Sequence, residues 1–120
     1  MTRGDIIVVE DDVSLSHAVC RLLQVAGFRT HAFTSAEAAL AGGQIDDAAC
    51  WVVDVRLPGM SGLDLCSELH EIAPRPIVVM TAHDDALARS RATAYGAAYL
   101  TKPFTGRALI GTINRLTGQR

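Results

Sequence analysis

Five polar side chains stand where short apolar runs of the sequence end, and their types could together form a reactive site. They are Glu10, Asp11, Asp54, Thr81 and Lys102. Taken alone, an acid or a hydroxyl in such a place is most often a helix cap or a loop residue, and a lysine is most often a surface charge. The shared position after apolar runs is therefore what makes these residues candidates.

Three of the five candidates are carboxylates, and they would converge if the first and third apolar runs form neighbouring strands. Like charges held a few ångströms apart repel one another unless a proton or a cation lies between them. Mg²⁺ prefers oxygen ligands and keeps several waters, so two carboxylates and a backbone carbonyl are enough to hold it. The carboxylates therefore predict a site for Mg²⁺ or Mn²⁺.

The other two candidates, Thr81 and Lys102, would add a hydroxyl and an ammonium beside that cation. A hydrogen-bond donor and a positive charge are what a transferred phosphoryl group requires. A carboxylate can act as the nucleophile in such a transfer. The residue types therefore favour phosphoryl chemistry at this edge.

Apolar runs alternate with stretches of helical period along the whole chain. The expected strands are residues 5–9, 28–33, 50–54, 77–81 and 97–101. The expected helices are residues 13–26, 61–72 and 84–95, together with an alanine-rich helix that runs from the 34–37 segment to Gly42 and a last helix that carries Leu109, Ile113 and Leu116. Five βα units are too few for a closed eight-stranded barrel and favour an open, doubly wound α/β sheet. In such sheets, ligands bind at the carboxyl ends of the strands.

Local signals predict how several of these elements begin and turn. Residues 34–37 (TSAE) and 61–64 (SGLD) both look like capping boxes at helix starts, and Asp12 looks like a helix cap. Pro58 and Gly59 predict a type II turn directly after the third strand, because the glycine can adopt the positive φ that this turn requires.

Length and composition place limits on function. The chain has 120 residues, 49% of them hydrophobic, and a net charge of −2, which fits one globular domain, residues 1–120, and argues against direct binding of nucleic acid. Its three cysteines have no metal-binding spacing, so we expect buried thiols in a reducing compartment. No signal peptide or membrane span is apparent at the start, so a cytoplasmic location without membrane attachment is expected.

Four motifs together resemble one family, the receiver domains of bacterial two-component response regulators, of the CheY-like kind and close to receivers of DNA-binding regulators. The motifs are IIVVEDD, VVDVRLPGMSGLDL, VVMTAHDD and AYLTKPF, and the match covers the whole chain. The resemblance implies a flavodoxin-like (βα)₅ fold with a five-stranded parallel sheet in the order 2-1-3-4-5. It also implies a role in a phosphorelay that controls an output, with transcription the expected one.

The same resemblance implies specific roles for the acidic residues. Asp54 would accept a phosphoryl group from a sensor histidine kinase, and Asp11 would ligate the metal directly. Glu10 stands where many members have aspartate, so its longer side chain would act directly or through a water molecule. The backbone carbonyl of Arg56 would complete the metal's protein ligands.

The remaining motif residues would stabilise the phosphoryl group and report its presence. Thr81 and Lys102 would meet its oxygens, and Tyr99 would swing inward as the Thr81 hydroxyl moves. The peptide bond before Pro103 would be cis. The signal would leave through the fourth helix, fifth strand and fifth helix, which could also form a homodimer face after phosphorylation.

Arg56 and His83 each lie two residues beyond a candidate, Arg56 after the acceptor and His83 after the hydroxyl. Their side chains could overhang the site and guide or block an attacking water, so we expect them to set the phosphate lifetime. The domain would then catalyse only its own phosphorylation and dephosphorylation and would otherwise not be an enzyme. DNA would be bound only through an effector domain absent from this chain, for example if the chain is the N-terminal part of a longer regulator.

Three alternatives share some of these features. A haloacid-dehalogenase-type phosphatase would have a second aspartate where this chain has Arg56. A flavodoxin-like cofactor binder would have a Ser, Thr and Gly-rich loop after the first strand, where EDDVS would repel phosphate. A receiver-like interaction module that is never phosphorylated is the main alternative, although the complete set of candidate residues argues against it.

Overall fold

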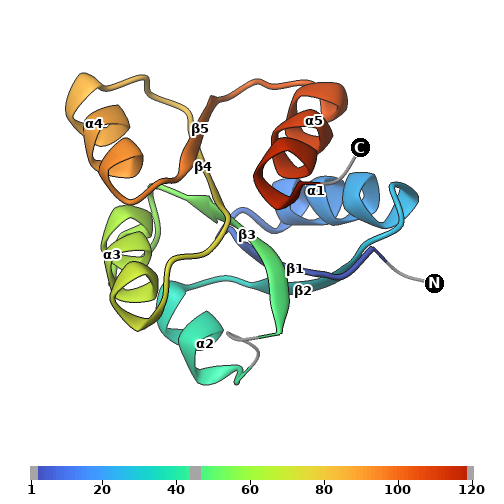
Figure 1. Ribbon diagram of the computed structural model, residues 1–120, viewed down its shortest axis with the longest axis horizontal. Helices are drawn as coiled ribbons and strands as arrows, with labels where there is room; N and C mark the ends of the chain where they lie inside the picture. The colour runs from blue at the N-terminus through green and yellow to red at the C-terminus, as the bar shows by residue number, and fades with distance from the viewer. Residues whose placement is uncertain (1–2, 44–46, 119–120) are drawn as a thin grey trace.

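The chain folds into five β-strands and five α-helices that alternate along the sequence (Figure 1). The computed structural model describes residues 3–43 and 47–118. The elements in order are β1 (Asp5–Val9), α1 (Val13–Val25), β2 (Arg29–Phe33), α2 (Ala36–Ala41), β3 (Ala48–Asp54), α3 (Gly62–Ile72), β4 (Ile77–Thr81), α4 (Ala86–Ala94), β5 (Ala98–Thr101) and α5 (Gly106–Thr117).

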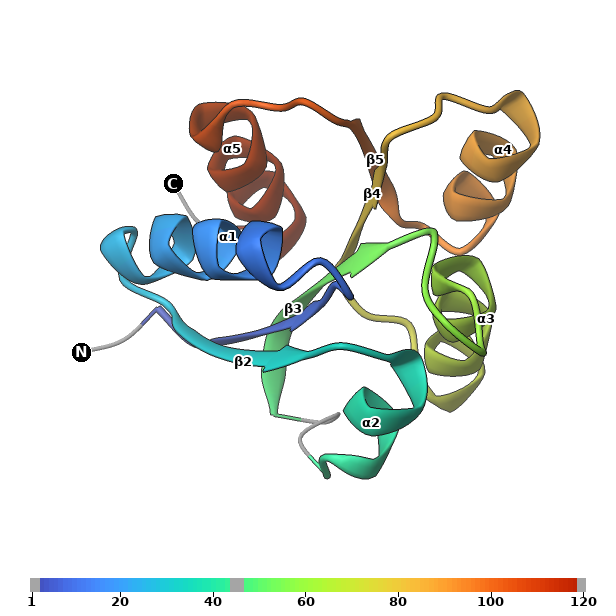
Figure 2. The ribbon, with the colours of Figure 1, turned by 180° about the vertical axis from the view of Figure 1, so that it is seen from behind.

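The strands form one parallel sheet in the order β2-β1-β3-β4-β5, which confirms the predicted topology. Helices α1 and α5 lie on one face of this sheet, and α2, α3 and α4 lie on the other (Figures 1 and 2). The central strands are apolar on both faces because helices cover both of them. Their carboxyl ends therefore meet at one edge of the sheet.

Each face of the sheet has its own hydrophobic core. Towards α1 and α5, side chains such as Val8, Val52 and Leu109 are fully buried. Towards α2, α3 and α4, Trp51 is fully buried at the centre of β3. Small alanines of α2 pack in the same cluster as this tryptophan, which lets the short helix lie close to the sheet.

Helix starts and stops follow the predicted signals in part. Asp12 caps α1 by accepting a hydrogen bond from the Leu15 amide, and Ser61 caps α3 in the same way. Gly59 has a φ of 70°, as the predicted turn requires. Strand β3 begins at Ala48, two residues earlier than expected, and α4 begins at Ala86, two residues later, because Asp85 is its cap.

The capping-box prediction for residues 34–37 is wrong. Ser35 is the cap of α2 and accepts from the Ala38 amide, so the helix starts one residue later than the pattern implies. The main partner of the Glu37 carboxylate is the Met60 amide, from which it accepts a hydrogen bond at 2.8 Å. This contact joins α2 to the loop that follows β3.

All three cysteines are buried and free of disulfide bonds, as expected. Burial raises the pKa of the Cys50 and Cys66 thiols to about 12, so both are neutral at physiological pH. Within the described residues, no helix is long and apolar enough to cross a membrane.

Candidate functional site

The candidate residues come together at the carboxyl edge of the sheet because four neighbouring strands end there. Glu10 directly follows β1, while Asp54 and Thr81 are the last residues of β3 and β4. Lys102 directly follows β5 and donates its amide to the Thr81 carbonyl at 2.7 Å. Parallel pairing of these strands thus places residues from distant parts of the sequence side by side.

An acidic cluster forms at this edge from Glu10, Asp11 and Asp54. Each offers one carboxylate oxygen, and these oxygens all lie within 4.8 Å of one another. Glu10 and Asp54 are buried, with 1% and 6% of their surface exposed, whereas Asp11 is exposed to solvent. The cluster therefore has one open side, through which a ligand can reach buried carboxylates.

The Lys102 ammonium lies between two of these acids. It is 2.8 Å from Glu10 Oε1 and 3.5 Å from Asp54 Oδ2. Burial alone would lower the pKa of Lys102, but the carboxylates of Glu10 and Asp54 outweigh burial and raise it. Lys102 is therefore a fixed positive charge beside Asp54.

Glu10 experiences opposing influences on its protonation. Burial and the neighbouring Asp54 carboxylate raise the pKa of Glu10, and Lys102 partly offsets them. The ion pair with Lys102 thus offsets part of the free-energy cost of burying an ionised carboxylate at this position. The direct or water-mediated role of Glu10 towards a metal stays a prediction.

Thr81 is buried, and its hydroxyl is engaged with the loop that follows β4. The hydroxyl donates to the His83 carbonyl at 3.0 Å and accepts from the His83 amide at 3.1 Å. Both bonds are local, so the hydroxyl can leave them for a stronger acceptor without unfolding of the strand. The hydroxyl would have to leave this turn to meet a group on Asp54.

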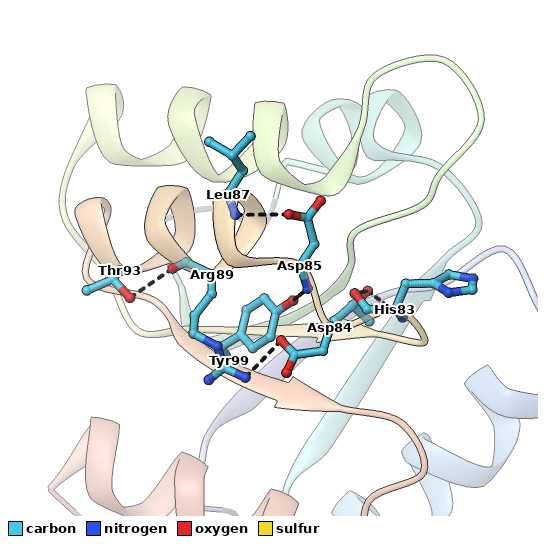
Figure 3. A network of polar contacts seen from close by, with 8 residues as sticks. His83, Asp84, Asp85, Leu87, Arg89, Thr93 and Tyr99 are labelled. Atoms are coloured by element: carbon cyan, nitrogen blue, oxygen red, sulfur yellow. Dashed lines mark hydrogen bonds and ion pairs between the residues drawn. The ribbon is translucent and has the colours of Figure 1, made fainter.

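Tyr99 connects the same loop to α4 (Figure 3). Its hydroxyl accepts a hydrogen bond from the Asp85 amide at 3.3 Å, and the Arg89 guanidinium lies 4.4 Å from the centre of its ring. Arg89 also pairs with Asp84 at 2.9 Å. The half-buried ring is therefore covered by α4, and its inward swing stays a prediction.

The structure also describes the other predicted positions. The side chains of Arg56 and His83 are exposed, and in Figure 3 the His83 ring points away from Tyr99 and Arg89. The bond between Lys102 and Pro103 is cis, in the form that the family resemblance implies. Ligation of a metal by the Arg56 carbonyl stays a prediction.

The donor set fits a hard divalent cation. Three carboxylates and one ammonium leave two formal negative charges at this edge, and every donor in the acidic cluster is oxygen. Oxygen donors with room for water are the ligands that Mg²⁺ and Mn²⁺ prefer. Glu10, Asp11 and Asp54 are the described residues that could hold such an ion.

Sequence reasoning missed two contacts near this site. The sequence assigned no contact to Arg89, but this residue lies against Tyr99 and pairs with Asp84. Glu37 appeared as part of a capping box, but it contacts the loop after Asp54. Neither contact has a local sequence pattern, because each depends on how separate elements pack.

Comparisons with known proteins agree with this geometry. The family described as response regulator receiver domain matches residues 6–114. Nodulation protein W of Bradyrhizobium diazoefficiens is 38% identical over 114 residues, which cover 93% of this chain and 50% of that protein. The transcriptional regulatory protein FixJ of Azorhizobium caulinodans is also 38% identical, over 93% of this chain and 54% of its own length.

Solved structures show the same likeness over nearly the whole chain. The BeF₃-activated receiver domain of DrrB superposes with a TM-score of 0.88 at 29% identity, covering 99% of this chain and all of that one (100%). A receiver domain protein from Clostridium thermocellum superposes with a TM-score of 0.90 at 25% identity, covering 96% of this chain and 94% of that one.

This chain belongs to the response regulator receiver domain family. As a receiver domain, it is a component of phosphorelay signal transduction and the part that accepts the phosphoryl group. It spans about half the length of the curated relatives that it matches.

Proposed function

We propose that Asp54 of this receiver domain accepts a phosphoryl group from the phosphohistidine of a sensor histidine kinase, with Mg²⁺ or Mn²⁺ held by the acidic cluster. The observation that carries the proposal is the position of the Asp54 carboxylate. It is buried at the end of a central strand, 3.5 Å from the Lys102 ammonium and grouped with Glu10 and Asp11. A nucleophile, a cation site and a positive charge thus meet at one point.

The transfer is a single exchange of bonds. A carboxylate oxygen of Asp54 attacks the phosphorus, a P–O bond forms, and the P–N bond of the phosphohistidine breaks with its electron pair going to the imidazole nitrogen. The Lys102 ammonium, held by Glu10 at 2.8 Å, faces the charge on the incoming phosphoryl oxygens. The fixed strand ends hold these groups in place before the donor arrives.

The phosphoryl group brings further negative charge to a site that is already acidic. A divalent cation bound there would neutralise the phosphoryl oxygens as they approach the carboxylates. Asp11 is the exposed member of the cluster and is placed to bind the ion directly, while Asp54 and the Arg56 carbonyl complete the set and Glu10 contributes directly or through water.

The acyl phosphate is removed by water, which attacks the phosphorus and releases inorganic phosphate as the Asp54 carboxylate returns. Arg56 and His83 are exposed and lie two residues after Asp54 and Thr81 in the sequence, and we assign them to the control of phosphate lifetime. Phosphorylated Arg56→Ala and His83→Ala variants should therefore lose phosphate at changed rates. Lifetimes within a factor of about two of the parent, equal to ~0.4 kcal/mol of barrier, would refute this assignment.

Phosphorylation adds nearly two negative charges next to Lys102 and gives the Thr81 hydroxyl a stronger acceptor than the His83 carbonyl. Movement of Thr81 out of its turn would release His83 and, through Asp85, the contact with Tyr99. We assign the signal to the face formed by α4, β5 and α5, which could pair with a second copy after phosphorylation.

The relatives suggest the setting of this switch. The matched FixJ protein is named a transcriptional regulatory protein, and this chain spans 54% of it. We therefore propose that this domain forms the N-terminal part of a longer regulator of transcription and meets DNA only through an effector domain outside this chain. The three free, buried cysteines support a reducing, cytoplasmic setting.

Intact mass spectrometry tests the proposal. The protein is incubated with Mg²⁺ and a small phosphodonor, and the wild type should gain one phosphoryl group while Asp54→Asn gains none. Asp12→Asn is the matched control, because Asp12 caps α1 beside Asp11 and asparagine can replace it as a cap. Equal labelling of wild type and Asp54→Asn would refute the assignment, because the phosphoryl group would then lie on another residue. No labelling of either would favour a module that works unphosphorylated.

A further inference from the structure

The loop that follows Asp54 receives a hydrogen-bond acceptor from a distant helix. Glu37 lies in the first turn of α2, and its Oε2 atom accepts from the Met60 amide at 2.8 Å. The two residues are 23 positions apart in the sequence. The Met60 amide lowers the pKa of the Glu37 carboxyl, as expected for a bond to the charged form.

Glycine at position 59 lets this carboxylate come close. A Cβ on Gly59 would lie 2.6 Å from Glu37 Oε2, and the φ of 70° is one that other residues rarely adopt. The carboxylate therefore lies directly against the backbone of the turn. Both the backbone shape and the missing side chain of Gly59 serve this contact.

Other hydrogen bonds fix the start of the loop to the sheet and tie its end to its start. The Val55 amide donates to the Met80 carbonyl on β4, and the Gly62 amide donates to the Val55 carbonyl, each at 2.9 Å. A Cβ on Gly62 would lie only 1.9 Å from the Asp54 carbonyl oxygen, so the end of the loop packs directly on the acceptor residue. Between these two anchors, the Glu37 carboxylate holds the outer part of the loop.

Helix α2 provides a firm base for this contact. Ser35 caps the helix, and Ala36 and Ala39 on either side of Glu37 are buried in the same core as Trp51 of β3. The Glu37 backbone therefore has little freedom to move relative to β3. A carboxylate presented from such a base can define where the loop lies.

We propose that Glu37 is a positioning residue for the phosphorylation site, because it holds the loop of residues 55–61 in the shape that carries the Arg56 carbonyl towards a bound cation. This inference rests on the proposed function and deepens it. Glu37 acts through the loop and does not touch the cation or the phosphoryl group. Its removal therefore weakens cation binding while the carboxylates of Glu10, Asp11 and Asp54 stay in place.

Two simpler roles for Glu37 make different predictions. If Glu37 only adds negative charge near the site or at the start of α2, Glu37→Gln and Glu37→Ala should have the same effect. If Glu37 acts through its hydrogen bond, glutamine should preserve most of the effect, since its amide oxygen can still accept from Met60. The two variants therefore separate charge from positioning.

Calorimetric titration with Mg²⁺ is the central experiment, with all proteins unphosphorylated. Glu37→Ala should bind Mg²⁺ roughly three- to tenfold more weakly than the wild type, and Glu37→Gln within about twofold of it. Glu71→Ala is the matched control, because it removes an equal charge from an exposed position on α3. It should leave the affinity unchanged.

Amide hydrogen exchange followed by NMR provides a readout that needs no cation. The Met60 amide should exchange faster in Glu37→Ala, while the Gly62 amide, bonded to Val55, should keep its wild-type rate. Unchanged exchange at Met60 would overturn the contact itself. An unchanged Mg²⁺ affinity in Glu37→Ala, or equal losses in the alanine and glutamine variants, would overturn the positioning role.

Two different results distinguish a wrong cation site from a wrong role for Glu37. If wild-type protein binds no Mg²⁺, the cation site of the proposed function is wrong, and the role of Glu37 in it is wrong as well. If wild type binds Mg²⁺ and is labelled on Asp54 while Glu37→Ala matches it in affinity, only the inference about Glu37 is overturned.

Discussion

Helices α4 and α5 both pack against β5, but different kinds of contact hold them. Helix α5 buries Leu109 and Ile113 completely in the core. Helix α4 buries only the small side chains of Ala88 and Ala92, and it exposes 75% of Leu87. Apolar burial thus fixes one neighbour of β5 far more firmly than the other.

Polar contacts near the surface also hold α4 against β5 and α3. Arg89 pairs with Asp84 at 2.9 Å and lies over the Tyr99 ring, and Arg91 pairs with Asp64 of α3 at 3.2 Å. Exposed pairs of this kind contribute about 0–1 kcal/mol each and can be exchanged for other partners. We therefore expect a modest change at the site to shift α4 while the buried side of α5 stays in place.

The largest expected effect comes from removing the apolar anchor of α5. Leu109→Ala should lower the free energy of unfolding by about 2–5 kcal/mol, because it leaves a cavity in a closed core. Ala92→Gly in α4 should cost only about 1 kcal/mol, mainly through helix propensity. Urea unfolding followed by circular dichroism measures both values, and equal losses would remove the contrast between the helices.

A smaller effect is expected when α4 loses its contact with Tyr99. Arg89→Ala should lower the free energy of unfolding by about 1 kcal/mol or less and should also increase the mobility of the Tyr99 ring seen by NMR. Arg107→Ala, which removes an exposed arginine from α5, is the control and should leave the ring signals unchanged. An unaltered Tyr99 ring in Arg89→Ala would show that α4 is held in another way.

The smallest effect concerns the pair that joins α3 to α4. The hydrogen bond from Arg91, followed by that from Ser61, lowers the pKa of the Asp64 carboxyl below its usual value of 3.8. The contribution of the Asp64–Arg91 pair to the free energy of unfolding is therefore complete above the pKa of Asp64 in the unfolded state. It is lost as the pH falls through the lowered pKa of Asp64 in the folded state.

Comparing the wild type with Arg91→Ala tests this pair. The free energies of unfolding should differ by less than about 1 kcal/mol at about pH 6, since the pair is exposed, and should converge at about pH 2. A difference that persists unchanged under acid conditions would assign the role of Arg91 to packing in place of its charge.

The sequence predicted the sheet and the meeting of the strand ends for a physical reason. Continuous apolar runs such as residues 50–54 and 77–81 require cover on both faces, and parallel order then brings their polar ends together. Asp54, Thr81 and Lys102 therefore converge in the structure as expected. Short-range signals also located the cap at Asp12 and the turn at Gly59.

What the sequence could not predict depends on contacts between separate elements. The segment 34–37 matches a capping box, but Met60 competes for the Glu37 carboxylate once α2 packs on the sheet. Likewise, the place of Arg89 over Tyr99 follows from the packing of α4 on β5. Local patterns carry no information on either partner, because the partners lie on other elements.

Peptide-resolved hydrogen exchange with mass spectrometry, performed with Mg²⁺ and acetyl phosphate, tests the central claim most directly. The peptide containing Asp54 should gain one phosphoryl group, peptides from α4 should exchange at a changed rate, and those carrying Leu109 and Ile113 should keep theirs. Asp54→Asn should show none of these changes. A phosphoryl group absent from the Asp54 peptide, or α4 peptides that exchange as they do in the unphosphorylated protein, would contradict the account.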